Sequence, residues 1–167
     1  MERVYVAVRL KSPDPGAATA LSTLRLVMPE CAPVQLSRYD LWEFDMKPGA
    51  SASVPGMISH FTDIVNPNKH QSFILTQGQP PPGENPGLRW TGVLVRDHSD
   101  SRSMNWSRLL PRRGFPVSSV RWGVLWRFGF GAGPGDIDAL AMKASLSESR
   151  DSGLLANPVS QEALPWK

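Results

Sequence analysis

Few side chains of this sequence stand where catalysis would need them. The three histidines, His60, His70 and His98, have no second histidine and no carboxylate at the spacing of metal ligands. Cys31 is the only cysteine, so the chain offers neither a disulfide nor a thiolate zinc site. No serine lies in the sequence context of a nucleophile elbow. We therefore expect no catalytic residue, no metal and no cofactor.

A glycine-rich segment, residues 129–135, lies between a predicted strand and a predicted helix, where backbone amides can bind phosphate. The dinucleotide-binding spacing needs a third glycine where Pro134 stands, and no Gly-Lys-Ser or Gly-Lys-Thr sequence is present. Asp136, at the start of the helix, would repel an anion. The favoured interpretation is a connector, with an anion site as the alternative.

Residues 113–117 read Arg-Gly-Phe-Pro-Val, which invites an RNA-recognition interpretation. That motif needs further aromatic residues at alternate positions to stack on bases, and Ser118 and Ser119 occupy the stretch where they would lie. The formal net charge is only +3, and the sequence contains no run of five or six residues of like charge. The sequence therefore disfavours nucleic acid as a partner.

Aromatic and arginine side chains on a protein surface are typical of protein–protein hot spots. Trp42, Phe44, Trp126 and Phe128 alternate within predicted strands, which indicates core packing for one face of the sheet. The predicted interface residues are Arg38, Tyr39, Arg121, Trp122, Gly123, Asn66, Asn157 and Pro158.

The elements that position these residues follow a regular order. The chain is 41% hydrophobic and 20% charged, which suits a packed core. In residues 1–75 we predict a strand over 4–8, a helix capped by Asp14, a long strand or bent hairpin over 34–46, an amphipathic helix over 54–65 and a strand over 72–75. This order is β-α-β-β-α-β.

Residues 76–87 are rich in proline and glycine and form a predicted linker. Residues 88–167 then repeat the order: a strand over 90–96, a helix over 100–110, a long strand pair over 117–130, a helix from Asp136 to about Leu155, and a short last strand. Asn66-Pro67 and Asn157-Pro158 read as helix stops, and Leu41-Trp42 matches Leu125-Trp126.

These matches in the same order predict an α+β protein of two tandem ferredoxin-like βαββαβ units, residues 1–75 and 88–167, joined by the linker 76–87. Each unit is small for an independent core. We expect their four-stranded sheets to cover each other or to join edge to edge, as a pseudo-dimer in one chain.

Three segments carry a resemblance to a known family. Residues 10–21 read Leu-Lys-Ser-Pro-Asp-Pro-Gly-Ala-Ala-Thr-Ala-Leu, residues 120–123 read Val-Arg-Trp-Gly, and residues 154–159 read Leu-Leu-Ala-Asn-Pro-Val. In these segments the chain resembles PurS, the small subunit of phosphoribosylformylglycinamidine synthase in purine biosynthesis. Two departures are Asp40 and Val124, which stand where the family carries lysine.

The resemblance implies a non-catalytic subunit that bridges the large synthetase subunit and the glutaminase subunit, as a tandem version of the PurS dimer. It leaves open a homo-oligomer, and the alternative is a ferredoxin-like adaptor or RNA-binding module with a different partner. No signal-peptide h-region or membrane-length apolar run occurs. We expect a cytoplasmic protein without a membrane partner.

Overall fold

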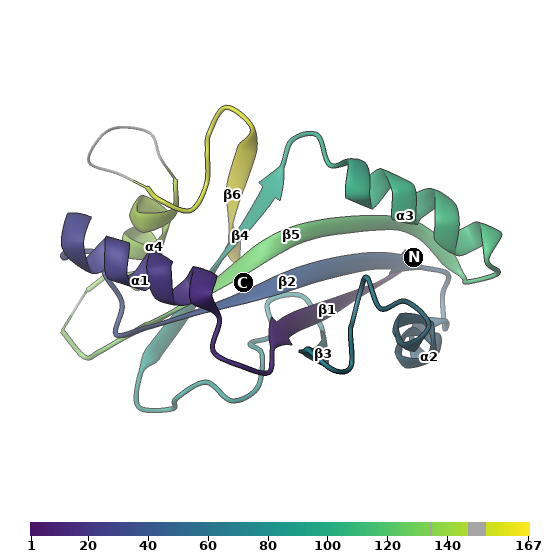
Figure 1. Cartoon of the computed structure of the whole chain (residues 1–167), viewed down its shortest axis with the longest axis horizontal. Helices are drawn as coiled ribbons and strands as arrows, with labels where there is room; N and C mark the ends of the chain where they lie inside the picture. Colours follow the sequence, from purple (N-terminus) through teal and green to yellow (C-terminus); the bar gives the residue numbers. More distant parts are fainter. Residues whose placement is uncertain (134, 147–152) are drawn as a thin grey trace.

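Six strands form one antiparallel sheet in the order β3-β1-β2-β5-β4-β6 (Figure 1). A computed structural model describes residues 1–133, 135–146 and 153–167. The strands are β1 (Glu2–Leu10), β2 (Gln35–Met46), β3 (His70–Leu75), β4 (Arg89–Asp97), β5 (Val117–Phe130) and β6 (Gln161–Trp166). The helices are α1 (Pro15–Val27), α2 (Val54–Ser59), α3 (Ser101–Arg112) and α4 (Ile137–Ser145), with one 3₁₀ turn, η1 (Ser51–Ser53).

The α+β class is confirmed, but the predicted four strands in each half are not seen, because each half contributes three strands among the described residues. β2 and β5 are single long strands of 12 and 14 residues. β2 is one continuous strand and not a hairpin, because it pairs with β1 on one side and with β5 on the other, with one irregularity at Asp45/Met46. The two halves therefore share one sheet, joined edge to edge through β2 and β5.

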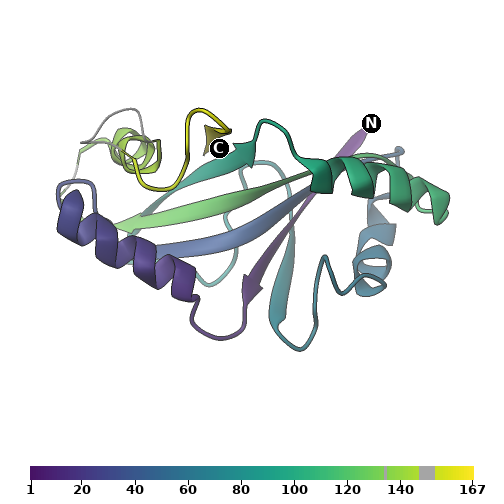
Figure 2. The same cartoon turned by 45° about the horizontal axis from the view of Figure 1, so that its top comes forward.

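The helices α1 to α4 lie on one face of the sheet (Figure 2). Alternate residues of a strand point to the same face. Leu36 of β2 packs with α1 and α4, and Trp42 and Phe44 of the same strand pack with α2 and α3. Among the described residues, no helix is long and apolar enough to span a bilayer.

The other face of the sheet is covered in part by the predicted linker. Tyr39, Leu41 and Leu125 are buried there in a third apolar cluster. The Trp166 indole N–H donates to the Gln79 carbonyl over 3.2 Å, and Glu84 accepts two hydrogen bonds from Arg127, at 2.6 and 3.0 Å. Residues 76–87 are thus packed against the sheet and are not a free spacer between domains.

The predicted helix boundaries agree best with the structure where a side chain caps the helix. Asp14 accepts from the Gly16 and Ala17 amides and begins α1, as predicted. The helix expected over 54–65 ends at Ser59, and the one expected from Asp136 to Leu155 is described only as α4. Residues 147–152 of that prediction lie outside the described residues.

Asn66-Pro67 and Asn157-Pro158 are not helix stops; each forms a turn that leads directly into an edge strand. The Asn66 carbonyl accepts from His70 N–H at 2.7 Å, and the Asn157 carbonyl accepts from Gln161 N–H at 2.7 Å. Each asparagine side chain accepts the amide two residues later at 3.0 Å. The two turns have the same hydrogen bonds, because asparagine can bond its own backbone ahead of a strand.

Candidate docking site

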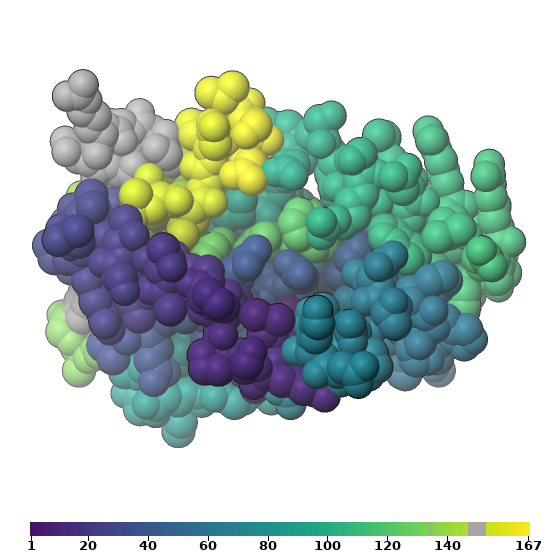
Figure 3. Space-filling model, in the orientation of Figure 1, coloured from purple at the N-terminus to yellow at the C-terminus, as the bar shows by residue number. Residues whose placement is uncertain are grey.

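The helices leave the middle of the sheet open on their own face. α1 and α4 cover one end, α2 and α3 cover the other, and β2 and β5 run between them (Figures 1 and 3). A cavity of about 390 Å³ lies here, next to one of about 470 Å³ beside the β1–α1 connection. We call this surface the central hollow and define it by five residues of β2 and β5: Arg38, Asp40, Trp122, Val124 and Trp126.

Arginine and tryptophan side chains stack along the central hollow. The Arg38 guanidinium lies 5.8 Å from the centre of the Trp126 ring, and the Arg102 guanidinium from α3 lies 4.1 Å from that of Trp122. Such cation–π contacts hold the guanidinium groups close to the aromatic rings. Asp14 adds an ion pair to Arg38 at 3.9 Å, so Arg38 has two charged or aromatic partners and is still 38% exposed.

Trp122 is anchored by its backbone, while its side-chain donor is unused. The Ser103 hydroxyl of α3 accepts the Trp122 backbone N–H at 2.8 Å. The Trp122 indole N–H is buried without an acceptor among the described residues. A buried donor of this kind costs stability unless a partner or water satisfies it.

Asp40 lies at the centre of the sheet, directly opposite Val124 on β5. Burial raises the pKa of the Asp40 carboxyl above its ordinary value of 3.8, while the positive charges of Arg38, Arg102 and His70 act to lower it. The carboxyl lines a small cavity of about 120 Å³ together with Arg38 and His70. The hollow therefore combines one desolvated carboxyl group with stacked arginines.

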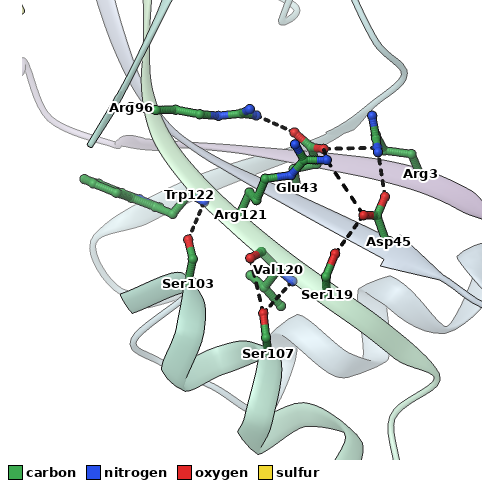
Figure 4. A network of polar contacts seen from close by, with 10 residues as sticks. All are labelled: Arg3, Glu43, Asp45, Arg96, Ser103, Ser107, Ser119, Val120, Arg121 and Trp122. Carbon is green, nitrogen blue, oxygen red and sulfur yellow. Dashed lines mark hydrogen bonds and ion pairs between the residues drawn. The ribbon is translucent and has the colours of Figure 1, made fainter. Parts of the chain in front are cut away.

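A second polar group lies on the opposite face and is shown in Figure 4. Glu43 and Asp45 are almost fully buried and lie beneath three arginines. Arg3 Nε is 3.0 Å from Glu43 and 2.8 Å from Asp45, Arg121 is 2.7 Å from Glu43, and Arg96 also pairs with Glu43. Ser119 donates to Asp45 at 2.7 Å. We call these residues the arginine cluster.

Sequence reasoning missed Glu43, Asp45, Arg3 and Arg96. Their signal was weak, because the arginines come from three different strands and meet only through the strand register. One sign was available: Glu43 and Asp45 alternate with Trp42 and Phe44. When a strand carries two acidic residues on one face and apolar residues on the other, the acidic side chains either are exposed to solvent or are paired with basic side chains.

The structure separates the predicted interface residues into three places. Arg38 and Trp122 lie in the central hollow. Tyr39, Arg121 and Gly123 point to the other face, since neighbouring strand residues alternate. Tyr39 is 2% exposed and thus inaccessible. Arg121 belongs to the arginine cluster, and Gly123 is buried in β5 beside its neighbour β4.

Asn66, Asn157 and Pro158 lie in the turns before β3 and β6. Because these strands form opposite edges of the sheet, the structure does not bring the two turns together, nor does it place either in the central hollow. Their observed role is to connect the preceding segment to an edge strand through local hydrogen bonds.

Within residues 1–133, 135–146 and 153–167, no three His, Cys, Asp or Glu side chains converge as metal ligands. In the glycine-rich segment, Asp136 caps α4 by accepting from the Ala139 amide at 3.1 Å, and Pro134 lies outside the described residues. The Gly131 carbonyl accepts from Arg89 at 3.3 Å. The observed contacts of this segment cap α4 and connect the segment to Arg89 of β4.

Comparison with protein-family models, with curated proteins and with solved structures found no match for this chain.

Proposed function

We propose that this chain is a non-catalytic, PurS-like subunit of the formylglycinamidine ribonucleotide synthase complex, which bridges the synthetase and the glutaminase. One chain would take the place of two family subunits. The observation that carries the proposal is the identical set of hydrogen bonds around Asn66-Pro67 and Asn157-Pro158. The second turn belongs to the segment Leu154 to Val159, where the resemblance is closest.

Further equivalences support two repeated units. Asp100 accepts from the Arg102 and Ser103 amides as Asp14 does from Gly16 and Ala17. β1 is flanked by β2 and β3, and β4 is flanked by β5 and β6, which gives the sheet order a two-fold pattern. If the two halves arose by duplication, Asp40 and Val124 are equivalent residues. They lie opposite each other where β2 pairs with β5 in the middle of the sheet.

The central hollow is the docking surface that this proposal requires. It lies where the two units meet, and it presents half-exposed Arg38 together with Trp122, whose side chain lines the cavity. Arginine and tryptophan are the side chains that contribute most to protein–protein hot spots. A partner segment with a carboxylate or carbonyl acceptor would bind the exposed guanidinium of Arg38.

The test is reconstitution with the large synthetase and glutaminase subunits of the same organism, in the presence of ATP and glutamine. We expect this chain to co-elute with both on gel filtration, and glutamine-dependent synthesis to require it. The double variant Arg38→Ala/Trp122→Ala should lose co-elution. Arg108→Ala serves as the matched control, because Arg108 is an exposed arginine of α3 outside the hollow.

Two outcomes would contradict the proposal. The chain could stay apart from both subunits while synthesis proceeds without it, which would favour an adaptor for a different partner. Alternatively, retention on nucleic acid that falls steeply with salt would favour RNA binding.

A further inference from the structure

β3 is an edge strand with free main-chain hydrogen-bonding groups. The Lys11 amide donates to the Lys69 carbonyl at 2.9 Å, and in an antiparallel pair such bonded positions alternate. The main chain of Phe73 is therefore hydrogen-bonded to that of Ala7 in β1, whereas Ser72 and Ile74 direct their main-chain N–H and C=O groups away from the sheet. Among the described residues, no hydrogen bond is made to these outward groups.

The groups on either side are already used. The His70 N–H donates back to the Asn66 carbonyl at 2.7 Å, and the Thr76 N–H donates to the Gln79 side chain at 3.0 Å. The open part of the edge is therefore short and well defined: it consists of Ser72 and Ile74.

The other edge, β6, is blocked at the corresponding place. The His98 amide donates to the Ser160 carbonyl at 2.9 Å, so the outward residues of β6 are Gln161, Ala163 and Pro165. Pro165 has no N–H, and the Gln161 N–H is taken by Asn157. By strand register, Pro165 of β6 stands where β3 has Ile74.

An apolar pocket adjoins the open edge. It measures about 340 Å³ and is lined by Pro55, Ile58, Val65, Pro67, Ser72 and Ile74, among others. Ile74 is 45% exposed, and its side chain lies on the same face of the sheet as that of Ser72. The edge therefore offers both an unfilled apolar pocket and an exposed aliphatic side chain.

We propose that two copies of this chain pair through β3, antiparallel about a two-fold axis at Phe73. Ser72 then faces Ile74 of the second copy, and the two pairs exchange four main-chain hydrogen bonds. Each Ile74 side chain is placed beside the pocket of the other copy. Both copies use the same surface, so the assembly is complete with two copies and cannot extend further. The two six-stranded sheets then form one sheet of twelve strands.

A second copy fits better than other strands of the chain because the edge is self-complementary. Pairing of β3 with β6 of another copy would repeat without closing, and Pro165 removes the N–H that this pairing needs. The proposal is independent of the proposed function, because it concerns the edge of the sheet and not the central hollow.

The first experiment measures molar mass by light scattering on gel filtration across a wide range of protein concentration. We expect a monomer–dimer equilibrium. Ile74→Pro should raise the dissociation constant about 30-fold, because each copy loses one inter-strand hydrogen bond. The matched control is Ala163→Pro, which removes an outward N–H from the other edge and should leave the dimer intact. A monomer at every concentration would overturn the proposal.

The second experiment keeps the test valid if Ile74→Pro fails to fold. At the two-fold axis, Phe73 faces Phe73 of the second copy with their Cα atoms about 4.5 Å apart, which a disulfide can span. Phe73→Cys should therefore form a disulfide-linked dimer on mild oxidation. Gln71→Cys should not, because its two Cα atoms would lie roughly 13 Å apart, four residues along the strand. A dimer in which neither Ile74→Pro nor Phe73→Cys has the expected effect uses another surface.

Discussion

Asp45 lies beneath Arg3 and Arg121, with 9% of its side chain exposed. Burial by itself would raise the pKa of this carboxyl, but hydrogen bonds from Arg3 and Ser119 and the charges of Arg3 and Arg121 outweigh it, and the pKa falls below the ordinary value of 3.8. A group with a lowered folded pKa stabilises the protein above its unfolded pKa, and this contribution is lost as the pH falls through the folded pKa.

We therefore predict that the free energy of unfolding falls as the pH drops below about 4. Asp45→Asn should cost about 1–3 kcal/mol at pH 7, because it removes a charged hydrogen-bond acceptor, and should flatten the acid dependence. Urea unfolding at pH 7 and at several values down to pH 2 measures both effects. Asp63→Asn, at an exposed loop position, should leave the pH profile unchanged; an unchanged profile in Asp45→Asn would contradict the prediction.

At the residue level, the sequence predicted buried aromatics better than it predicted paired charges. Trp42 and Phe44 are buried, as their alternation indicated. Arg38 and Tyr39 were grouped as one surface, although neighbouring strand residues point to opposite faces. The arginine cluster depends on the register of four strands, which a single sequence does not reveal.

The close pairing of β4 and β5 depends on a missing side chain. A Cβ atom at Gly123 would lie 2.7 Å from the Val95 carbonyl oxygen and 2.9 Å from Leu94 Cδ1. These contacts are shorter than the van der Waals separation, and the obstructing oxygen belongs to the backbone of β4. Gly123 thus allows the two strands and their side chains to approach.

Gly123→Ala should lower the free energy of unfolding by about 1–3 kcal/mol, the usual cost of overpacking. Thermal or urea denaturation measures the loss. Gly56→Ala is the matched control: it lies in α2 with no atom within 4 Å of the new Cβ, and alanine should stabilise the helix by about 0.5–1 kcal/mol. Equal effects at the two positions would refute the packing explanation.

The predicted elements were most accurate where side-chain chemistry acts locally. Asp14 caps α1 because its carboxylate is two residues from the first free amide. The Asn-Pro pairs were misread, since proline excludes a preceding helical residue but does not require that a helix comes before it. The apolar spacing over residues 54–65 suggested one helix, whereas after Ser59 the same residues reach the core from turns.

For the molecule as a whole, the pairing of β2 with β5 makes the two halves one structural unit. Separating the halves would expose the edges of two long strands. Exposed edges of this kind pair with other chains, so we expect the separate halves to aggregate. The sequence indicated two halves and left open whether their sheets cover each other or join edge to edge, because strand pairing between distant segments leaves no local pattern.

We predict that Leu125→Ala destabilises both halves equally. Leu125 is fully buried beside residues of β1, β2 and β4, and its truncation should cost about 2–5 kcal/mol. Native-state hydrogen exchange should show the same loss of protection at Val6 in β1 and at Leu94 in β4. Loss in the second half alone would mean that the halves unfold separately. Leu26→Ala, at an 84% exposed position, is the control.

The contact between Asp40 and Val124 has a consequence for how a partner is positioned. In a dimer of identical chains, any residue beside the two-fold axis meets its own copy, and a partner can bind in either of two equivalent orientations. Here a carboxyl group faces an aliphatic side chain, so the two orientations differ in charge. A single chain with this sheet can therefore impose one direction on whatever binds across its centre.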